Sequence, residues 1–158
     1  MSTTPRSAHT GIQQLRAAAS SNSGIGKLLG MRVEQIEVGT VSFSLDPRPD
    51  FANPMGTVHG GVLATLLDTV VSCAVHSALT DGAGYATVSL TTNYVRSVGT
   101  DAGTITGEGR VVHLGRRIAT AEGTVMSSDG SLLVHGSATC LIIQPRHDSE
   151  SANAEKAG

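Results

Sequence analysis

The sequence predicts an α+β fold in which an antiparallel sheet accompanies one long helix. From Gly61 to Leu79 the residues are helix formers or small and no proline intervenes, which predicts a helix of about eighteen residues. The segments before and after it alternate between apolar and polar residues, as half-buried strands do. Two strands, a helix and then four strands with short connections favour an antiparallel sheet over alternating βαβ units.

The chain of 158 residues fits one domain that can bury a sizeable core. We expect residues 1–24 to be a flexible segment in which 12–19 can form a short helix, and residues 144–158 to be a polar, disordered tail. The folded domain is then expected over residues 25–143.

A turn or short helix over 24–30 is expected to lead into the sheet. The predicted strands cover 31–38, 40–46, 83–95, 104–113, 116–126 and 132–143. In the third of these, Ala86, Val88 and Leu90 are expected on one face, and the threonines and serine between them on the other. A hairpin turn is predicted over 127–130, where the sequence reads Ser-Ser-Asp-Gly.

The long helix is apolar in nearly every direction, which predicts a helix buried almost all round. The main exceptions, Thr65, Asp68, Ser72 and His76, follow one another at spacings of three, four and four, so they form a single line. Burying an unpaired carboxylate is costly. Asp68 is therefore either a satisfied structural residue or a catalytic carboxylate beside a pocket.

The sequence His59-Gly60-Gly61 lies where this helix begins. Unpaired backbone N–H groups and the positive end of the helix dipole favour negative charge there, and glycine lets a ligand approach the backbone closely. The helix start is thus a candidate for binding an oxyanion, although a glycine-rich helix start is also commonly just a tight turn.

These features occur together in a longer pattern, Asn53-x-x-Gly56-x-x-His59-Gly60-Gly61, with Asp68 nine residues after the histidine and Ser72 four residues later. This pattern resembles the signature of hotdog-fold acyl-CoA thioesterases, most closely the PaaI-like, phenylacetate-pathway branch. The resemblance covers about residues 25–143. It implies a highly curved antiparallel sheet wrapped around the helix, and two subunits that form active sites at their interface, with the homodimer often paired into a homotetramer.

The resemblance also implies catalytic roles. Asp68 corresponds to the general base or nucleophile, and the Gly60 N–H to the donor that binds the thioester oxygen. Asn53 and His59 correspond to polar groups that position water or shape the site. Ser72 would orient the substrate or the carboxylate.

Further residues are candidates for binding the substrate. Gly61 is a candidate because glycine lets a ligand approach the backbone closely, and the resemblance adds Thr87 on the following strand as a further contributor. It also implies that basic residues at positions such as Arg96, Arg116 and Arg117 contact the phosphates of CoA. Arginine suits phosphate because its planar guanidinium presents a fork of donors. Exposed arginines at strand ends are equally often only solvated, and that alternative stays open here.

Composition excludes several other classes of protein. A formal net charge of -2 and a pI near 6.3 lack the basic character of a general nucleic-acid binder. The N-terminus lacks the apolar core of a secretory signal, and polar residues interrupt the best candidate for a membrane span. Cys73 and Cys140 read as small core residues. We therefore expect a soluble, cytoplasmic protein with no membrane or nucleic-acid partner.

Known cofactor and nucleophile motifs are also missing. His76, His113 and His135 are isolated in sequence and no HExxH or paired-cysteine motif occurs, so no metal site is expected. Neither a GxSxG nucleophile elbow nor a phosphate-binding P-loop is present. No cofactor is expected, because the CoA thioester is itself the substrate.

The leading interpretation is hydrolysis of an aryl, short-chain or medium-chain acyl-CoA to the free acid and CoA. One alternative is hydration or dehydration of an enoyl-CoA, which in hotdog relatives usually draws on a differently spaced His and acidic pair that we do not find. A second alternative is a non-catalytic acyl-CoA-binding protein. The sequence distinguishes neither the acyl group nor a base from a nucleophile at Asp68.

Overall fold

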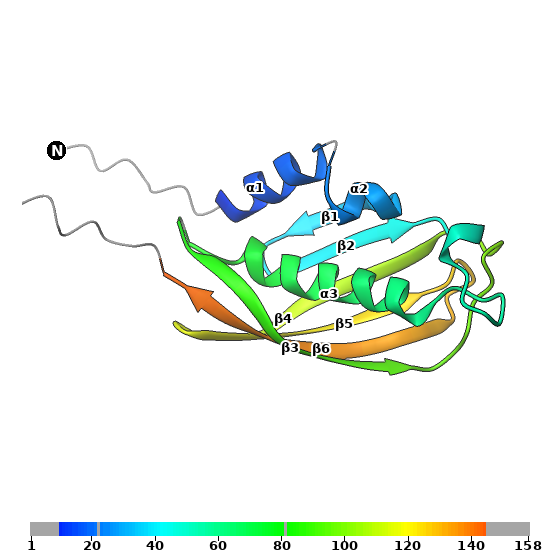
Figure 1. The fold of residues 1–158 in the computed structure, drawn as a ribbon. Helices are drawn as coiled ribbons and strands as arrows, with labels where there is room; N and C mark the ends of the chain where they lie inside the picture. The colour runs from blue at the N-terminus through cyan, green and yellow to red at the C-terminus, as the bar shows by residue number, and fades with distance from the viewer. Residues whose placement is uncertain (1–9, 22, 81, 145–158) are drawn as a thin grey trace, which may run out of the picture.

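The computed structural model describes residues 10–21, 23–80 and 82–144, which form one curved sheet around a central helix (Figure 1). The elements are α1 (Thr10–Ala19), α2 (Ile25–Leu29), β1 (Arg32–Glu37), β2 (Thr40–Leu45), the 3-10 turn η1 (Pro49–Phe51), α3 (Gly60–Ser77), β3 (Gly84–Tyr94), β4 (Ile105–Leu114), β5 (Ile118–Met126) and β6 (Leu132–Ile143). The predicted α+β class, the long helix and the six strands are confirmed. The segment expected to be flexible at residues 1–9 and the tail from 145 lie outside the described residues.

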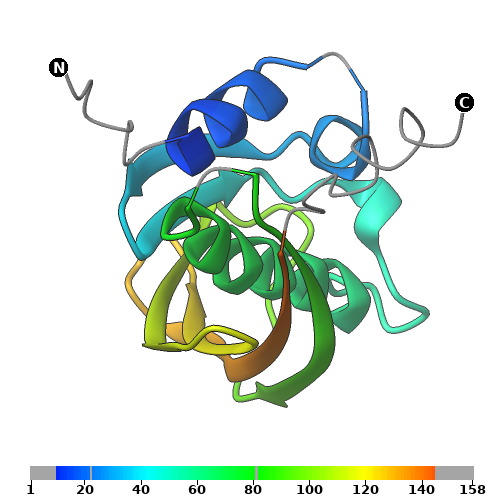
Figure 2. The same cartoon turned by 90° about the vertical axis from the view of Figure 1, so that its left-hand side faces the viewer.

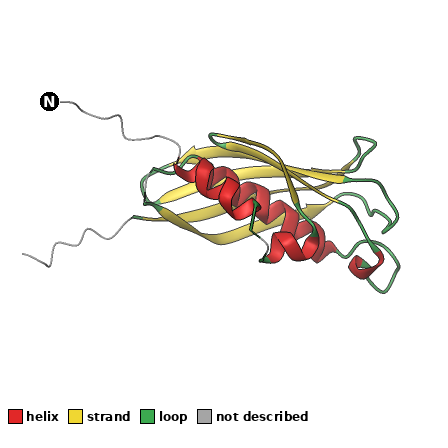
Figure 3. Ribbon diagram, turned by 90° about the horizontal axis from the view of Figure 1, so that it is seen from above, coloured by secondary structure: helices red, strands yellow, loops and turns green. Residues whose placement is uncertain are grey.

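All neighbouring strands pair antiparallel, in the order β1-β2-β4-β5-β6-β3, so β1 and β3 form the two edges of the sheet. Seen along the axis of α3, the sheet curls around the helix (Figure 2). From above, the helices lie over the strands as a second layer (Figure 3). The curved sheet around one helix is as expected.

Aliphatic side chains of α3 fill the concave side of the sheet. Leu66, Leu67 and Val70 are fully buried there. Two glycines on the facing strands let the helix come close: a Cβ on Gly109 would overlap the carbonyl oxygen of Val70, and one on Gly123 would lie 2.8 Å from the side chain of Val71. These contacts fix the position of α3 against β4 and β5.

By length and composition alone, α3 qualifies as a candidate membrane span, with a mean hydropathy of 1.3. We expected the polar residues of α3 to exclude it as a membrane span, but its length and mean hydropathy do not exclude it. Half of the helix is buried within the fold, and a core helix passes the same test.

A β-bulge changes which residues of β3 face the helix. Thr87 pairs with a residue of β6 and so does the residue after Val88, so Val88 is extra and is 59% exposed. The expected regular alternation, with Ala86, Val88 and Leu90 on one face, is therefore wrong. Before the bulge Thr87 is half-buried, and after the bulge Leu90 is half-buried.

The N-terminal helix α1 packs against α3 and β1. Leu15 is buried in the common core, and the side chain of Gln14 hydrogen-bonds Nε2 of His76 at 2.8 Å. The helix begins two residues before the predicted 12–19. Although the sequence placed this segment ahead of the folded domain, α1 shares the domain's core.

Candidate active site

The loop ahead of α3 is held by the side chain of Asn53. Its Oδ1 accepts hydrogen bonds from the backbone N–H of Met55 at 2.9 Å and of Thr57 at 3.2 Å, and its Nδ2 donates to Thr57 Oγ1 at 2.9 Å. These bonds use both acceptor sites of the amide oxygen. Within this chain Asn53 therefore shapes the loop and retains one N–H for another partner.

His59 is the N-cap of α3. Its Nδ1 accepts a hydrogen bond from the Gly61 N–H at 2.8 Å, so neutral His59 carries its proton on Nε2. This bond occupies the Gly61 N–H. Among the described residues the Gly60 N–H has no hydrogen-bond partner, which makes it the available donor at the helix start.

Tyr94, at the end of β3, contacts the same helix start. Its O–H donates to the Gly60 carbonyl at 2.9 Å, and its ring lies 3.1 Å from where a Cβ on Gly60 would be. A side chain at position 60 would therefore push against the ring. Sequence reasoning missed Tyr94, and its one signal was that the chain has only two tyrosines.

Asp68 lies two turns into α3 and is half-buried. The Thr87 hydroxyl donates to its Oδ1 at 3.3 Å, a long hydrogen bond. Among the described residues no Lys, Arg or His forms an ion pair with Asp68. The structure thus places Thr87 beside Asp68 and leaves most acceptor positions of the carboxylate free.

The other polar residues of the helix line bond mostly to nearby backbone. Thr65 Oγ1 donates to the Gly61 carbonyl at 2.8 Å, and Ser72 Oγ to the Thr69 carbonyl at 3.3 Å. Ser72 is buried one turn after Asp68 and lies on the same face, but its hydroxyl bonds to the Thr69 carbonyl and not to the carboxylate.

Several titratable groups on the same part of α3 and on β3 are largely buried. Burial raises the pKa of the Cys73 thiol to about 12, and the charge of Asp68 adds to that shift. Burial likewise raises the pKa of Tyr85 and lowers that of His76, whose ring packs edge-on against Tyr85 at 5.4 Å between centroids. Electrostatic effects on a ligand are stronger in such a setting than in water.

Gly60 and Asp68 are not brought together within one chain. They are eight residues apart on a continuous helix, which at 1.5 Å per residue separates them by about 12 Å along the axis. One carbonyl group cannot reach both the N–H of Gly60 and the carboxylate of Asp68 in the same chain.

The three candidate arginines are also divided between two places. Arg96 follows β3 near the start of α3, and its Nη1 donates to Ser131 Oγ at 2.9 Å. Arg116 and Arg117 lie in the β4–β5 connection, where Arg116 lines a hollow together with Leu79, just past the end of α3. All three are exposed. A single chain therefore presents two separate basic positions, one toward each end of α3.

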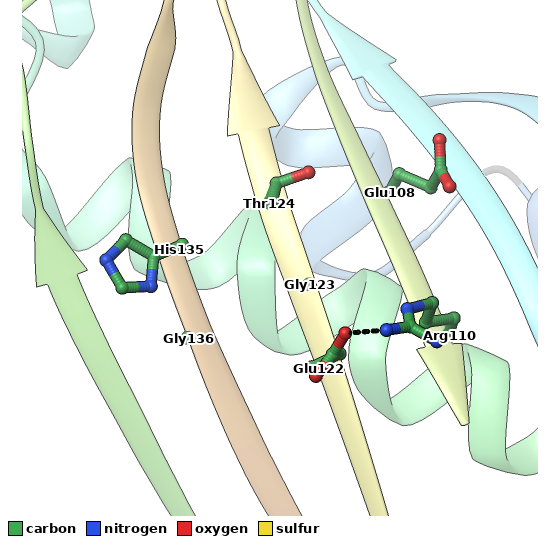
Figure 4. A pocket seen from close by; sticks show the side chains of 7 residues that line it. All are labelled: Glu108, Arg110, Glu122, Gly123, Thr124, His135 and Gly136. Atoms are coloured by element: carbon green, nitrogen blue, oxygen red, sulfur yellow. Dashed lines mark ion pairs between the residues drawn. The ribbon is translucent and has the colours of Figure 1, made fainter. Parts of the chain in front are cut away.

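A hollow of about 360 Å³ on the outer face of the sheet belongs to a different part of the molecule (Figure 4). Glu108, Arg110, Glu122 and His135 line it, and Arg110 forms an ion pair with Glu122. None of the predicted site residues lies there. Within the described ranges, no group of three or more His, Cys, Asp and Glu side chains is placed to hold a metal ion.

The chain thus has a curved antiparallel sheet around one helix, with His-Gly-Gly at the helix start and an aspartate two turns later, as the resemblance to hotdog-fold thioesterases implies. The model of the family described as "Thioesterase superfamily" matches residues 55–134. The chain belongs to this superfamily and is a thioester hydrolase.

Individual relatives agree with this assignment. A Pseudomonas aeruginosa protein provisionally named an esterase is 31% identical over 105 residues, which cover 66% of this chain and 70% of that protein. A Halobacterium salinarum protein with the same provisional name is 32% identical over 109 residues, with 66% and 70% covered.

A Ralstonia eutropha structure, described as that of a provisional thioesterase related to phenylacetic acid degradation, has a TM-score of 0.73 and 29% identity over 83% of this chain and 98% of that one. The resemblance to the PaaI-like branch is thereby confirmed.

Proposed function

We propose that this protein hydrolyses an acyl-CoA thioester to a free acid and CoA, and that Asp68 is the catalytic carboxylate. One observation carries the assignment of Asp68. The carboxylate is half-buried among groups shielded from water, yet its one side-chain hydrogen bond within the described residues is the long one from Thr87. A structural aspartate would be expected to have its acceptor positions filled.

Asp68 can act in two ways. As a general base it takes a proton from water, which attacks the thioester carbon; as a nucleophile it attacks that carbon itself and forms an anhydride, which water then hydrolyses. In both routes the C–S bond breaks, the sulfur leaves as the CoA thiolate and takes up a proton, and the acyl carbon becomes a carboxylate. The Gly60 N–H would stabilise the oxyanion that forms on the way.

We further propose that two copies of the chain build each site. The separation of about 12 Å between Gly60 and Asp68 requires the oxyanion donor to come from a second helix start. β3 is an edge strand of eleven residues with free backbone groups, and such edges readily pair with another strand. A homodimer joined along β3, which can pair again into a homotetramer, supplies the second helix.

In the same proposal, Arg96, Arg116 and Arg117 contact the CoA phosphates, with one end of the nucleotide held by each basic position. His59 Nε2–H and the remaining N–H of Asn53 are donors that can hold water or the thioester beside the Gly60 N–H. The Gly61 N–H already donates to His59, so Gly61 only allows the substrate to approach the backbone closely.

A screen of aryl, short-chain and medium-chain acyl-CoA esters for released thiol tests the reaction. Crotonyl-CoA is included so that loss of the double bond without thiol release would identify a hydratase. Tight binding of CoA esters without any turnover would identify a binding protein. Light scattering at assay concentrations tests the assembly, and a fully active monomer would contradict the shared site.

A further inference from the structure

A cavity of about 530 Å³ lies between the N-terminal helices, the first two strands and α3. Its apolar walls come from Leu15 and Ala18 of α1, Val33 of β1, Phe43 of β2 and the residue Met31 between α2 and β1. Cavities of this size with mainly apolar walls are typical of small-molecule sites. The family match begins at residue 55, so α1, α2, β1 and β2 all lie outside it.

The cavity reaches the helix that carries Asp68. Thr69 and Cys73, one turn apart on α3, form its wall on that side, and Thr69 follows Asp68 directly. Asp68 is not among the residues that line the cavity, but a group that leaves the cavity past Thr69 would lie on the same turn of α3 as Asp68.

Most polar side chains in the wall already have partners. Thr69 Oγ1 donates to the Thr65 carbonyl at 2.8 Å, and Ser20 Oγ donates to the Arg16 carbonyl at 3.0 Å. The guanidinium of Arg32 makes two hydrogen bonds to Asp46. Lys27, the other cation that lines the cavity, is exposed. The interior therefore offers few unused donors to a polar ligand.

We propose that this cavity binds an unbranched aliphatic acyl chain whose thioester carbonyl lies beside Asp68. This inference rests on the proposed thioesterase function and names its substrate class. Among the described residues, Phe43 is the one aromatic residue that lines the cavity, so an aryl group would find few rings against which to stack. An aliphatic chain needs no hydrogen bonds and gains from each methylene that leaves water.

The chain-length profile of hydrolysis tests the proposal. For the parent, kcat/KM is expected to rise about fourfold with each methylene from butyryl-CoA to octanoyl-CoA, until the cavity is filled. Ala18→Phe and, as a second blocking variant, Ala19→Phe place a ring in the cavity and should lower the octanoyl-to-butyryl ratio at least about tenfold. Both alanines line the cavity but are exposed, so the ring need not overpack the core. Ala17→Phe is the matched control, because Ala17 is exposed on the same helix and does not line the cavity.

Calorimetric binding of S-ethyl-CoA and S-octyl-CoA separates the cavity from catalysis, because these thioethers have no carbonyl to hydrolyse. The parent and Ala17→Phe should bind the octyl compound more tightly, and the blocking variants should lose that preference. Equal binding of both thioethers by the parent, or an unchanged chain-length preference in folded Ala18→Phe and Ala19→Phe, would overturn the proposal while leaving hydrolysis intact. A parent that prefers the octyl compound but hydrolyses no ester would retain the cavity assignment and refute the proposed function.

Discussion

Replacing Asp68 by asparagine separates a catalytic carboxylate from a structural one. Asparagine is nearly isosteric and its oxygen can still accept the Thr87 hydrogen bond, but it can neither take a proton from water nor form an anhydride. Loss of base catalysis alone costs on the order of 10² to 10⁴ in rate, or about 2.7 to 5.4 kcal/mol of transition-state stabilisation. The Thr87 bond is long at 3.3 Å, so we expect the free energy of unfolding to change by less than about 1 kcal/mol.

The measurement is kcat on the best ester from the screen, alongside a thermal melt and a sizing profile. For a chain of this length the expected change in Tm is no more than about 4 °C. Glu108→Gln is the matched control, because it removes the charge of an exposed carboxylate in the outer hollow and should leave kcat within about twofold of the parent.

If the Asp68→Asn variant is folded and correctly assembled and its kcat is within a few-fold of the parent's, the catalytic assignment is refuted. A parallel loss of Tm and activity would instead identify Asp68 as structural. If activity is lost in an intact variant, single-turnover labelling in heavy-oxygen water then separates the two routes, since nucleophilic attack places solvent oxygen first in the Asp68 side chain.

Three further expectations follow from the geometry. Arg116→Ala and Arg117→Ala should each raise KM about 10- to 150-fold, because a charge-assisted hydrogen bond contributes about 1.5 to 3 kcal/mol. Added salt should raise the KM of the parent as well. An unchanged KM in the variants would identify both arginines as surface residues without a role in binding. Burial lowers the pKa of His76, so the unfolded chain binds a proton at this residue more readily than the folded chain, and stability should fall as pH drops below about 6.5. His76→Gln should flatten this part of a curve of Tm against pH. The same slope in the variant and the parent would contradict this role of His76. Gly109→Ala should lower the free energy of unfolding by about 3 kcal/mol, because the added Cβ would overlap the Val70 carbonyl. Gly26→Ala is the control, because its Cβ would meet nothing closer than 4.0 Å. Denaturant unfolding measures both variants, and equal midpoints would disprove the close packing at Gly109.

Much of the fold could be predicted because the sequence patterns are local. The helix was expected to begin at Gly61 and begins at Gly60, and β6 spans the predicted 132–143. The Ser127–Gly130 turn forms as its sequence suggests, with Gly130 at φ 82°. The line of polar residues on the helix could likewise be predicted, since helical spacing alone determines which residues share a face.

The site depends on contacts that no local pattern describes. Tyr94 reaches Gly60 from a strand 34 residues away in sequence, and the N-terminal cavity combines small residues of α1 with β1 and α3. The separation of Gly60 from Asp68 becomes evident only once both are placed on one straight helix. The proposed site therefore takes these two groups from two copies of the chain.

The extra residue in β3 allows this strand to serve both ends of α3. Thr87 and Tyr94 are seven positions apart, an odd number, so a regular strand would point their side chains to opposite faces of the sheet. Both nevertheless bond to α3, one at Asp68 and the other at Gly60, because Val88 shifts the phase by one residue between them. Deleting Val88 would restore regular alternation and allow only one of these two contacts at a time, so a single position in the strand couples the carboxylate to the helix start.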